Sequence, residues 1–213
     1  MTSAESEHDQ GRAEPLRTRG TAVARLLTEV LAPWVIVLLL PLAVAWQATH
    51  ALLPTLLWGL LVAVTSSILP MGIIVWGART GRWDGHHVRN REGRLIPFVA
   101  LLVFSLGGLA ALILARAPWL VIALDISMIS TLIVTGAITS RWKISMHTAV
   151  AGGAVVILAA TYSPVFWLLA VLVAAIGWSR VKIHDHTTAQ TIGGAIVGAI
   201  SGGGLYAPLS GVL

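Results

Sequence analysis

The sequence contains no cysteine and carries few charges. None of its 213 residues is a cysteine, and only 11% are Asp, Glu, Lys or Arg. The absence of thiols excludes disulfide bonds and thiolate metal sites. The chain is 56% hydrophobic, with a mean hydropathy of +0.85. This composition excludes an ordinary soluble domain, whose surface helices each present a polar face to water.

Long apolar runs take the place of those charges. Runs of about 18 residues or more predict membrane-spanning helices. We therefore expect an all-α, polytopic transmembrane helix bundle with about seven segments. Residues 1–24 are polar and predict a disordered tail without a cleavable signal peptide, followed by a single domain over residues 25–213. The expected segments are 27–46, 52–76 (kinked or broken near Pro70), 95–115, 119–139, 146–161, 165–178 and 188–207. The fifth and sixth are short for a bilayer.

The polar residues concentrate in three loops, 79–94, 140–147 and 177–190. Counting the segments puts these loops and the tail on one face of the membrane, with every Lys and Arg except Arg116. The positive-inside rule makes that face cytoplasmic in a multi-pass cell-membrane protein. A phosphate site in the same loops would also need cations, so topology and function both explain the charge. The pI near 10.7 then indicates anionic lipid headgroups as the partner and not nucleic acid.

The residue types in these loops suit metal-free phosphoester cleavage. Histidine can attack phosphorus or protonate the leaving group, and arginine binds phosphate oxygens in pairs. Helix N-termini add oriented N–H donors. Ser145 is the expected cap of the helix that begins at residue 146, and Thr187 or Thr188 of the last one.

One loop resembles a known signature. Ser179-Arg180, five residues and then His186 is similar to the Ser-Arg-x5-His-x3-Asp signature of the type 2 phosphatidic acid phosphatase superfamily, which also contains vanadium haloperoxidases. Ile-Ser-Met-His, with Ser145 and His147, matches part of the family's Pro-Ser-Gly-His signature. His87-x6-Arg94 followed by Pro97 is a weaker match to Lys-x6-Arg-Pro. The loop order also agrees, and the resemblance covers residues 77–208.

The resemblance implies a role for each matching residue. His186 would be the nucleophile that forms a phosphohistidine, and His147 the general acid for the leaving group. The family's membrane members use no metal or other cofactor and dephosphorylate lipids such as phosphatidate, phosphatidylglycerophosphate and polyprenyl phosphates or diphosphates. The implied phosphate-binding residues are Arg180, Ser145 and Arg94, with Arg91 and Lys143 as helpers.

The sequence departs from the family pattern at three positions. Gln190 stands where the family has Asp, so it can orient His186 but adds no charge. Asp185 would substitute if the loop folds back onto His186. Met146 replaces a Gly and narrows the expected pocket, and His87 replaces a Lys.

Other interpretations of the same residues stay open. The cations of the loops would otherwise meet lipid headgroups, and the arginines of residues 79–94 would set topology. His147 would otherwise be a histidine facing water at a helix start, and His184 would be structural. His86 and His87 lack the carboxylates of a zinc or iron site.

Three functions therefore follow from the sequence. The first is an integral membrane lipid phosphatase, and the second a catalytically silent relative that binds or moves a phospholipid or a protein partner. The third is a proton-coupled transporter using Asp125, an intramembrane carboxylate that can equally be structural. Gly194, Gly198 and Gly202 recur every four residues and predict close helix packing.

Overall fold

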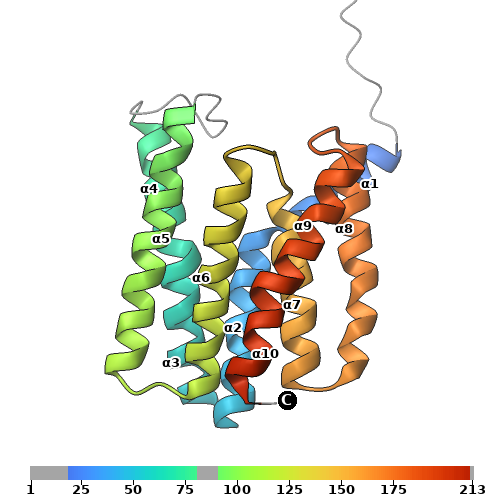
Figure 1. The fold of residues 1–213 in the computed structure, drawn as a ribbon. Coiled ribbons are helices and arrows are strands. Elements are labelled where there is room, and N and C mark those ends of the chain that lie inside the picture. Colours follow the sequence, from blue (N-terminus) through green and yellow to red (C-terminus); the bar gives the residue numbers. More distant parts are fainter. Residues whose placement is uncertain (1–18, 81–90, 212–213) are drawn as a thin grey trace, which may run out of the picture.

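A computed structural model describes residues 19–80 and 91–211, and these residues form helices and turns without any strand. The helices run roughly side by side in one bundle (Figure 1). Four of them are long and apolar enough to cross a membrane, or five if a bent pair counts as one span. The described residues thus form an all-helical bundle with four or five candidate membrane spans. The number seven stays a prediction.

The N-terminal part of the bundle differs most from expectation. The first expected segment is two helices, α1 (Arg19–Val30) and α2 (Pro33–Thr49), bent by 42° at residues 31–32. Pro33 occupies the first turn of α2, where its missing N–H costs no helical hydrogen bond. Its ring also disfavours helical geometry at the preceding residue, Ala32. The membrane segment predicted over 27–46 therefore falls within a bent pair of helices, which is a candidate span only when the two helices are counted together. Helix α1 also begins inside the range 1–24 that was expected to be a tail.

The second expected segment is one long helix with an internal irregularity. It comprises α3 (Leu52–Ala63), a π-helical turn η1 (Val64–Ile68) and α4 (Leu69–Arg79). Pro70 cannot donate to the carbonyl of Ser66 four residues earlier, and its ring crowds that carbonyl. The π turn includes Ser66 and ends two residues before Pro70, close to the position where the sequence predicted a kink.

The remaining helices follow the predicted pattern more closely. Helices α6 (Trp119–Thr139) and α7 (Met146–Thr161) have the predicted bounds, and α5 is Arg91–Leu114. The sixth segment is longer than predicted, with η2 (Pro164–Leu169) and α8 (Ala170–Lys182) giving a 19-residue span. The last comprises α9 (Thr188–Gly198), a π turn η3 (Ala199–Gly204) and α10 (Leu205–Ser210).

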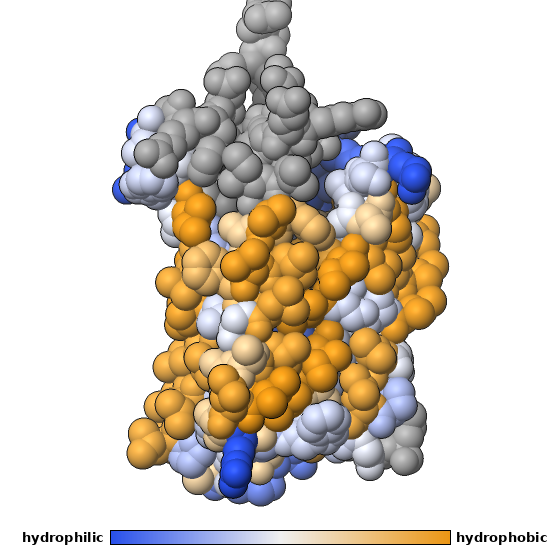
Figure 2. All heavy atoms as spheres, turned by 60° about the vertical axis from the view of Figure 1, so that its left-hand side comes forward, coloured by the Kyte–Doolittle hydropathy of each residue, from blue (hydrophilic) through white to orange (hydrophobic). Residues whose placement is uncertain are grey.

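The surface matches a protein embedded in lipid. Large hydrophobic side chains are exposed along the helices, among them Leu53, Leu114 and Leu168. Apolar residues cover most of the middle of the face in Figure 2, and the most hydrophilic residues lie toward its two ends. Lipid tails, and not water, are the solvent that suits such a surface.

Helices α7 and α9 make backbone contact. A Cβ on Gly198 would strike the carbonyl of Ala149, and one on Gly152 would lie 2.5 Å from the carbonyl oxygen of Ala195. The predicted close packing at the glycines of the last helix is confirmed. Its consequence is that the N-terminal ends of α7 and α9 lie beside each other at one end of the bundle (Figure 1).

Candidate functional site

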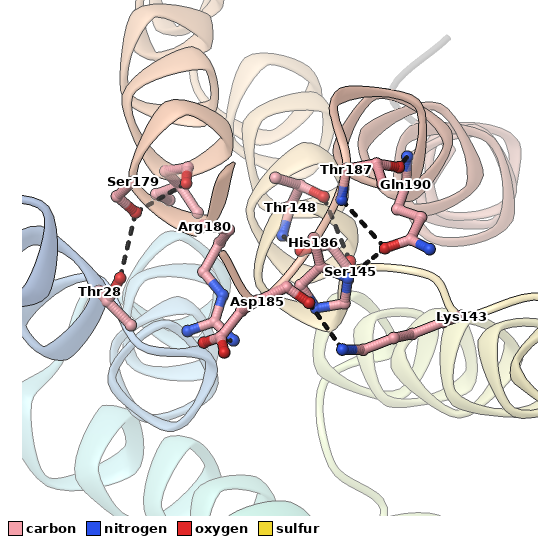
Figure 3. A network of polar contacts seen from close by, with 11 residues as sticks. Thr28, Lys143, Ser145, Thr148, Ser179, Arg180, Asp185, His186, Thr187 and Gln190 are labelled. Atoms are coloured by element: carbon pink, nitrogen blue, oxygen red, sulfur yellow. Dashed lines mark hydrogen bonds and ion pairs between the residues drawn. The ribbon is translucent and has the colours of Figure 1, made fainter. Parts of the chain in front are cut away.

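The connections α6–α7 and α8–α9 meet at that end of the bundle. The backbone N–H of Ser145 donates to the carbonyl of Gln190 at 3.2 Å, and Lys143 Nζ donates to the carbonyl of Asp185 at 2.6 Å. The first bond joins the start of α7 to the first turn of α9. The second ties residues 140–145 to the loop 183–187 (Figure 3). Two polar segments far apart in the sequence thus form one cluster.

The loop 183–187 begins at a sharply ended helix. The N–H of Asp185 donates to the carbonyl of Arg180, and that of His184 to the carbonyl of Val181, which is the Schellman pattern. His184 adopts φ of 61°, the left-handed conformation that this motif requires and that glycine usually supplies. His184 therefore has a structural position, as the sequence predicted. The turn directs the chain back so that His186 N–H also reaches the carbonyl of Arg180.

Gln190 holds His186 in one orientation. The amide oxygen of Gln190 lies 3.1 Å from Nδ1 of His186 and also accepts the N–H of Thr187 at 3.1 Å. Because a backbone N–H can only donate, the second bond fixes which end of the amide faces the imidazole. His186 Nδ1 must then carry the proton, so in the neutral ring Nε2 has a free lone pair.

The same residues cap helix α9. Thr187 Oγ1 accepts the N–H of Gln190 at 3.3 Å, which with the reverse bond completes a capping box. The expected caps are confirmed at both helix starts, because Ser145 Oγ accepts the N–H of Thr148 at 3.5 Å. Ser145 is fully buried in this capping position. Its predicted contact with a phosphate oxygen stays a prediction.

Arg180 lies at the centre of the cluster and is only partly satisfied. Its guanidinium forms an ion pair with the carboxylate of Asp185 at 2.8 Å, and its side chain is 13% exposed. Arg180 Nε is buried and has no hydrogen-bond partner among the described residues. A buried N–H without an acceptor costs about 1–3 kcal/mol. An anion with several acceptor oxygens would satisfy that donor and the rest of the guanidinium together.

Asp185 does not take the orienting role suggested for it. Its carboxylate turns to Arg180, and the recorded partner of the His186 ring is Gln190. A carboxylate forms a stronger hydrogen bond with a charged guanidinium than with a neutral imidazole. The hypothesis that Asp185 orients His186 is therefore wrong, because the residue bonded to that ring is Gln190.

His147 belongs to the same electrostatic environment. It lies in the first turn of α7, half buried, and the charges of Arg180, His186 and Asp185 all act on its ring. Burial lowers the pKa of His186 below its ordinary value of 6.5, and Lys143 and Arg180 lower it further, against the effect of the Gln190 bond. His186 is therefore neutral near pH 7, in the form that can attack.

The other predicted site residues lie apart from this cluster or outside the described residues. Arg91 and Arg94 are in the first turn of α5, but their side chains are outside the described part, and His87 is wholly outside it. Within residues 19–80 and 91–211, no three His, Cys, Asp or Glu side chains gather as metal ligands.

Helix α1 supports the site, a contact that the sequence analysis did not predict. Thr28 and Ser179 hydroxyls are buried and 3.1 Å apart, which joins α1 to α8 directly beside Arg180 (Figure 3). Glu29, in the same helix, acts electrostatically on Arg180. Neither Thr28 nor Glu29 belongs to a loop signature, so the motifs did not indicate this contact.

Comparison with known proteins adds no relative: no protein-family model, curated protein or solved structure matches the chain.

Proposed function

We propose that this chain is an integral membrane lipid phosphatase that hydrolyses a phosphate or diphosphate monoester through a phosphohistidine on His186, without a metal. The observation that carries the proposal is the pair of bonds at the Gln190 amide oxygen. They hold Nδ1 of His186 as a donor and leave Nε2 as the attacking atom.

Two further features support an anionic substrate. The unpartnered Nε of Arg180 and the ammonium of Lys143 lie in the same cluster as His186. The starts of α7 and α9 add the partial positive charge of two helix N-termini. A phosphate group would replace the Asp185 carboxylate on Arg180, or share the guanidinium with it.

The chemical steps follow from these positions. Nε2 of His186 attacks phosphorus, the P–O bond to the lipid breaks, and His147 gives its proton to the departing alkoxide. The phosphate dianion itself favours the protonated form of His147 needed for that step. A water then attacks the phosphohistidine and gives its proton to His147, the P–N bond breaks, and inorganic phosphate leaves.

Location in the membrane argues for a lipid substrate. The cluster lies at the end of apolar helices whose exposed faces suit lipid tails. A phosphate carried by a lipid headgroup would therefore meet the cluster at the membrane surface. In this proposal the loops 79–94, 140–147 and 177–190 share one membrane face, which is cytoplasmic.

The direct test is phosphate release by the purified protein in detergent with a chelator present. We expect release from phosphatidate, phosphatidylglycerophosphate or a polyprenyl phosphate or diphosphate. His186→Ala should abolish it, and His184→Ala, two residues away, should retain it. Loss of release on chelation alone would exclude the metal-free mechanism.

Absence of release from every lipid, by protein that remains folded, would favour the catalytically silent relative. The observation that would then explain it is the ion pair of Arg180 with Asp185, which already occupies the guanidinium. A phospholipid-binding measurement on the same preparation would separate that relative from a protein without a phosphate site.

A further inference from the structure

A second polar cluster lies within the helices, apart from the loops. Asp125, in α6, is completely buried, and Ser66 Oγ lies 3.4 Å from its Oδ1. Ser105 Oγ, in α5, lies 3.4 Å from Ser66 Oγ. Three helical elements thus each contribute one oxygen to a cluster inside the bundle. The proposed phosphatase makes no use of it.

Asp125 is left incomplete by its protein neighbours. Its Oδ2 is buried without a hydrogen-bond partner among the described residues. The one ion pair within those residues is Arg180 with Asp185, so no cation there pairs with Asp125. If the carboxyl is ionised, Oδ2 lacks a donor. If Oδ2 is protonated, its proton lacks an acceptor. In both cases the group is costly in an apolar interior, which indicates an additional ligand.

The spacing of the oxygens is unusual for hydrogen bonds and suitable for a cation. Hydroxyl bonds to oxygen normally measure about 2.5–3.0 Å, shorter than both contacts here. A cation that holds its oxygens at about 2.3–2.6 Å, as calcium does, places adjacent octahedral ligands about 3.3–3.7 Å apart. Sodium has nearly the same radius as calcium. Its single charge would neutralise the one carboxylate, whereas calcium would leave an excess positive charge in the membrane interior.

The bundle also has room beside these serines. Ser66 and Ser105 line a cavity of about 230 Å³ between α2, η1, α5, α6 and α7. A water molecule needs about 10–15 Å³ measured in this way and about two to four polar partners, which the hydroxyls of Ser66, Ser105 and Ser127 on the cavity wall can supply. Ser66 lies in the π turn η1, and such turns often occur at functional sites.

We propose that Asp125, Ser66 and Ser105 form a binding site for a partly dehydrated sodium ion inside the helix bundle. The carboxylate neutralises the ion, the two hydroxyls donate lone pairs to it, and cavity waters fill the remaining positions. Potassium is larger and would push the three oxygens further apart, so the site favours sodium. This inference does not depend on phosphatase activity.

The experiment uses the full-length protein in detergent at constant ionic strength. We expect the melting temperature to rise with the logarithm of NaCl concentration, to rise less in KCl and not to rise in choline chloride. Binding of radioactive sodium should saturate near one ion per chain. Ser66→Ala and Ser105→Ala should each weaken sodium binding about tenfold or more, because each removes one oxygen from a buried charge.

Two further variants make the test specific. Asp125→Asn should abolish sodium binding. Ser127→Ala is the matched control, because Ser127 lines the same cavity but donates its hydroxyl to the Ala123 carbonyl at 2.8 Å. It should bind sodium as the wild type does. Equal melting temperatures in sodium and choline, or a protein that responds to pH but not to sodium, would overturn the site. If Asp125→Asn fails to fold, the serine variants decide the question.

Discussion

His186 combines the two properties that a nucleophilic histidine needs. Its proton is held on Nδ1 by Gln190, and its pKa is lowered by burial and by nearby Lys143 and Arg180. The first property frees Nε2, and the second keeps the ring neutral without a general base. A neutral, oriented imidazole is the reactive form in phosphohistidine chemistry.

This protonation state predicts a pH dependence. Because the folded pKa of His186 lies below 6.5, the nucleophile stays neutral as pH falls from 8 through neutrality, and protonates only below its ordinary value. We expect kcat/KM, which reports the free enzyme, to decline on the acid side of 6.5 as His186 protonates, and to decline on the alkaline side as the general acid His147 loses its proton. A pH profile of phosphate release measures it. An acid limb centred above pH 7 would contradict the assignment of His186 as the nucleophile.

Gln190 offers a more direct probe of the same bond. Gln190→Glu keeps the chain length and the acceptor oxygen, and a glutamate at this helix position also completes a capping box. The new charge stabilises the imidazolium and raises the pKa of His186, so the acid limb should move to higher pH. Phosphorylation of the ring should also accelerate, by about tenfold for each 1.36 kcal/mol of stabilisation.

Gln190→Leu is the matched opposite change. It removes the acceptor while it retains a side chain of similar size. We expect a large loss of phosphate release and a reduced helix stability of about 1 kcal/mol from the broken cap. Activity unchanged in both variants would show that the Gln190 bond has no part in catalysis.

At the scale of elements, the site depends on how closely α7 approaches α9. His147 is the second residue of α7, and His186 directly precedes Thr187, the N-cap of α9. Their separation is therefore set by the glycine contacts between these two helices. Backbone carbonyls oppose these glycines, and backbone cannot yield as a flexible side chain does. A single methyl group added at one of these glycines should therefore change the separation of His147 and His186.

Gly198→Ala tests that dependence. Its methyl would overlap the carbonyl of Ala149, so the helices must separate, and we expect a loss of about 1–3 kcal/mol in stability together with reduced phosphate release. Gly107→Ala is the control, since a Cβ there meets no atom within 4 Å. Replacing an open helical glycine should leave stability unchanged or raise it by up to about 1 kcal/mol. Equal melting temperatures for the two variants would refute the role of the close contact.

The sequence predicted elements whose signals are local. Helix α7 begins at Met146 because Ser145 caps it, and α6 follows Pro118 at Trp119, and both starts are readable from residue type. The glycine spacing predicted the α7–α9 contact in the same way. What failed depended on tertiary context: the pairing of Asp185 with Arg180, and α1 folding onto α8 through Thr28. A loop carboxylate has several cations within reach, and the sequence does not rank them.

For the whole molecule, the absence of cysteine makes membrane orientation measurable. A single cysteine introduced at Lys182, which is exposed at the site end, or at Ala51, which is exposed beyond α2, would be the only thiol in the chain. The distribution of Lys and Arg predicts that the site end faces the cytoplasm, because the topology expected from the sequence puts all of them except Arg116 on that side. In intact cells, a membrane-impermeant thiol reagent should therefore label Ala51→Cys and not Lys182→Cys.

Permeabilised cells should give labelling of both cysteines, which controls for burial. The reverse pattern in intact cells would place the proposed phosphatase site outside the cytoplasm. Labelling of both positions in intact cells would mean that the helices between them do not cross the membrane as proposed.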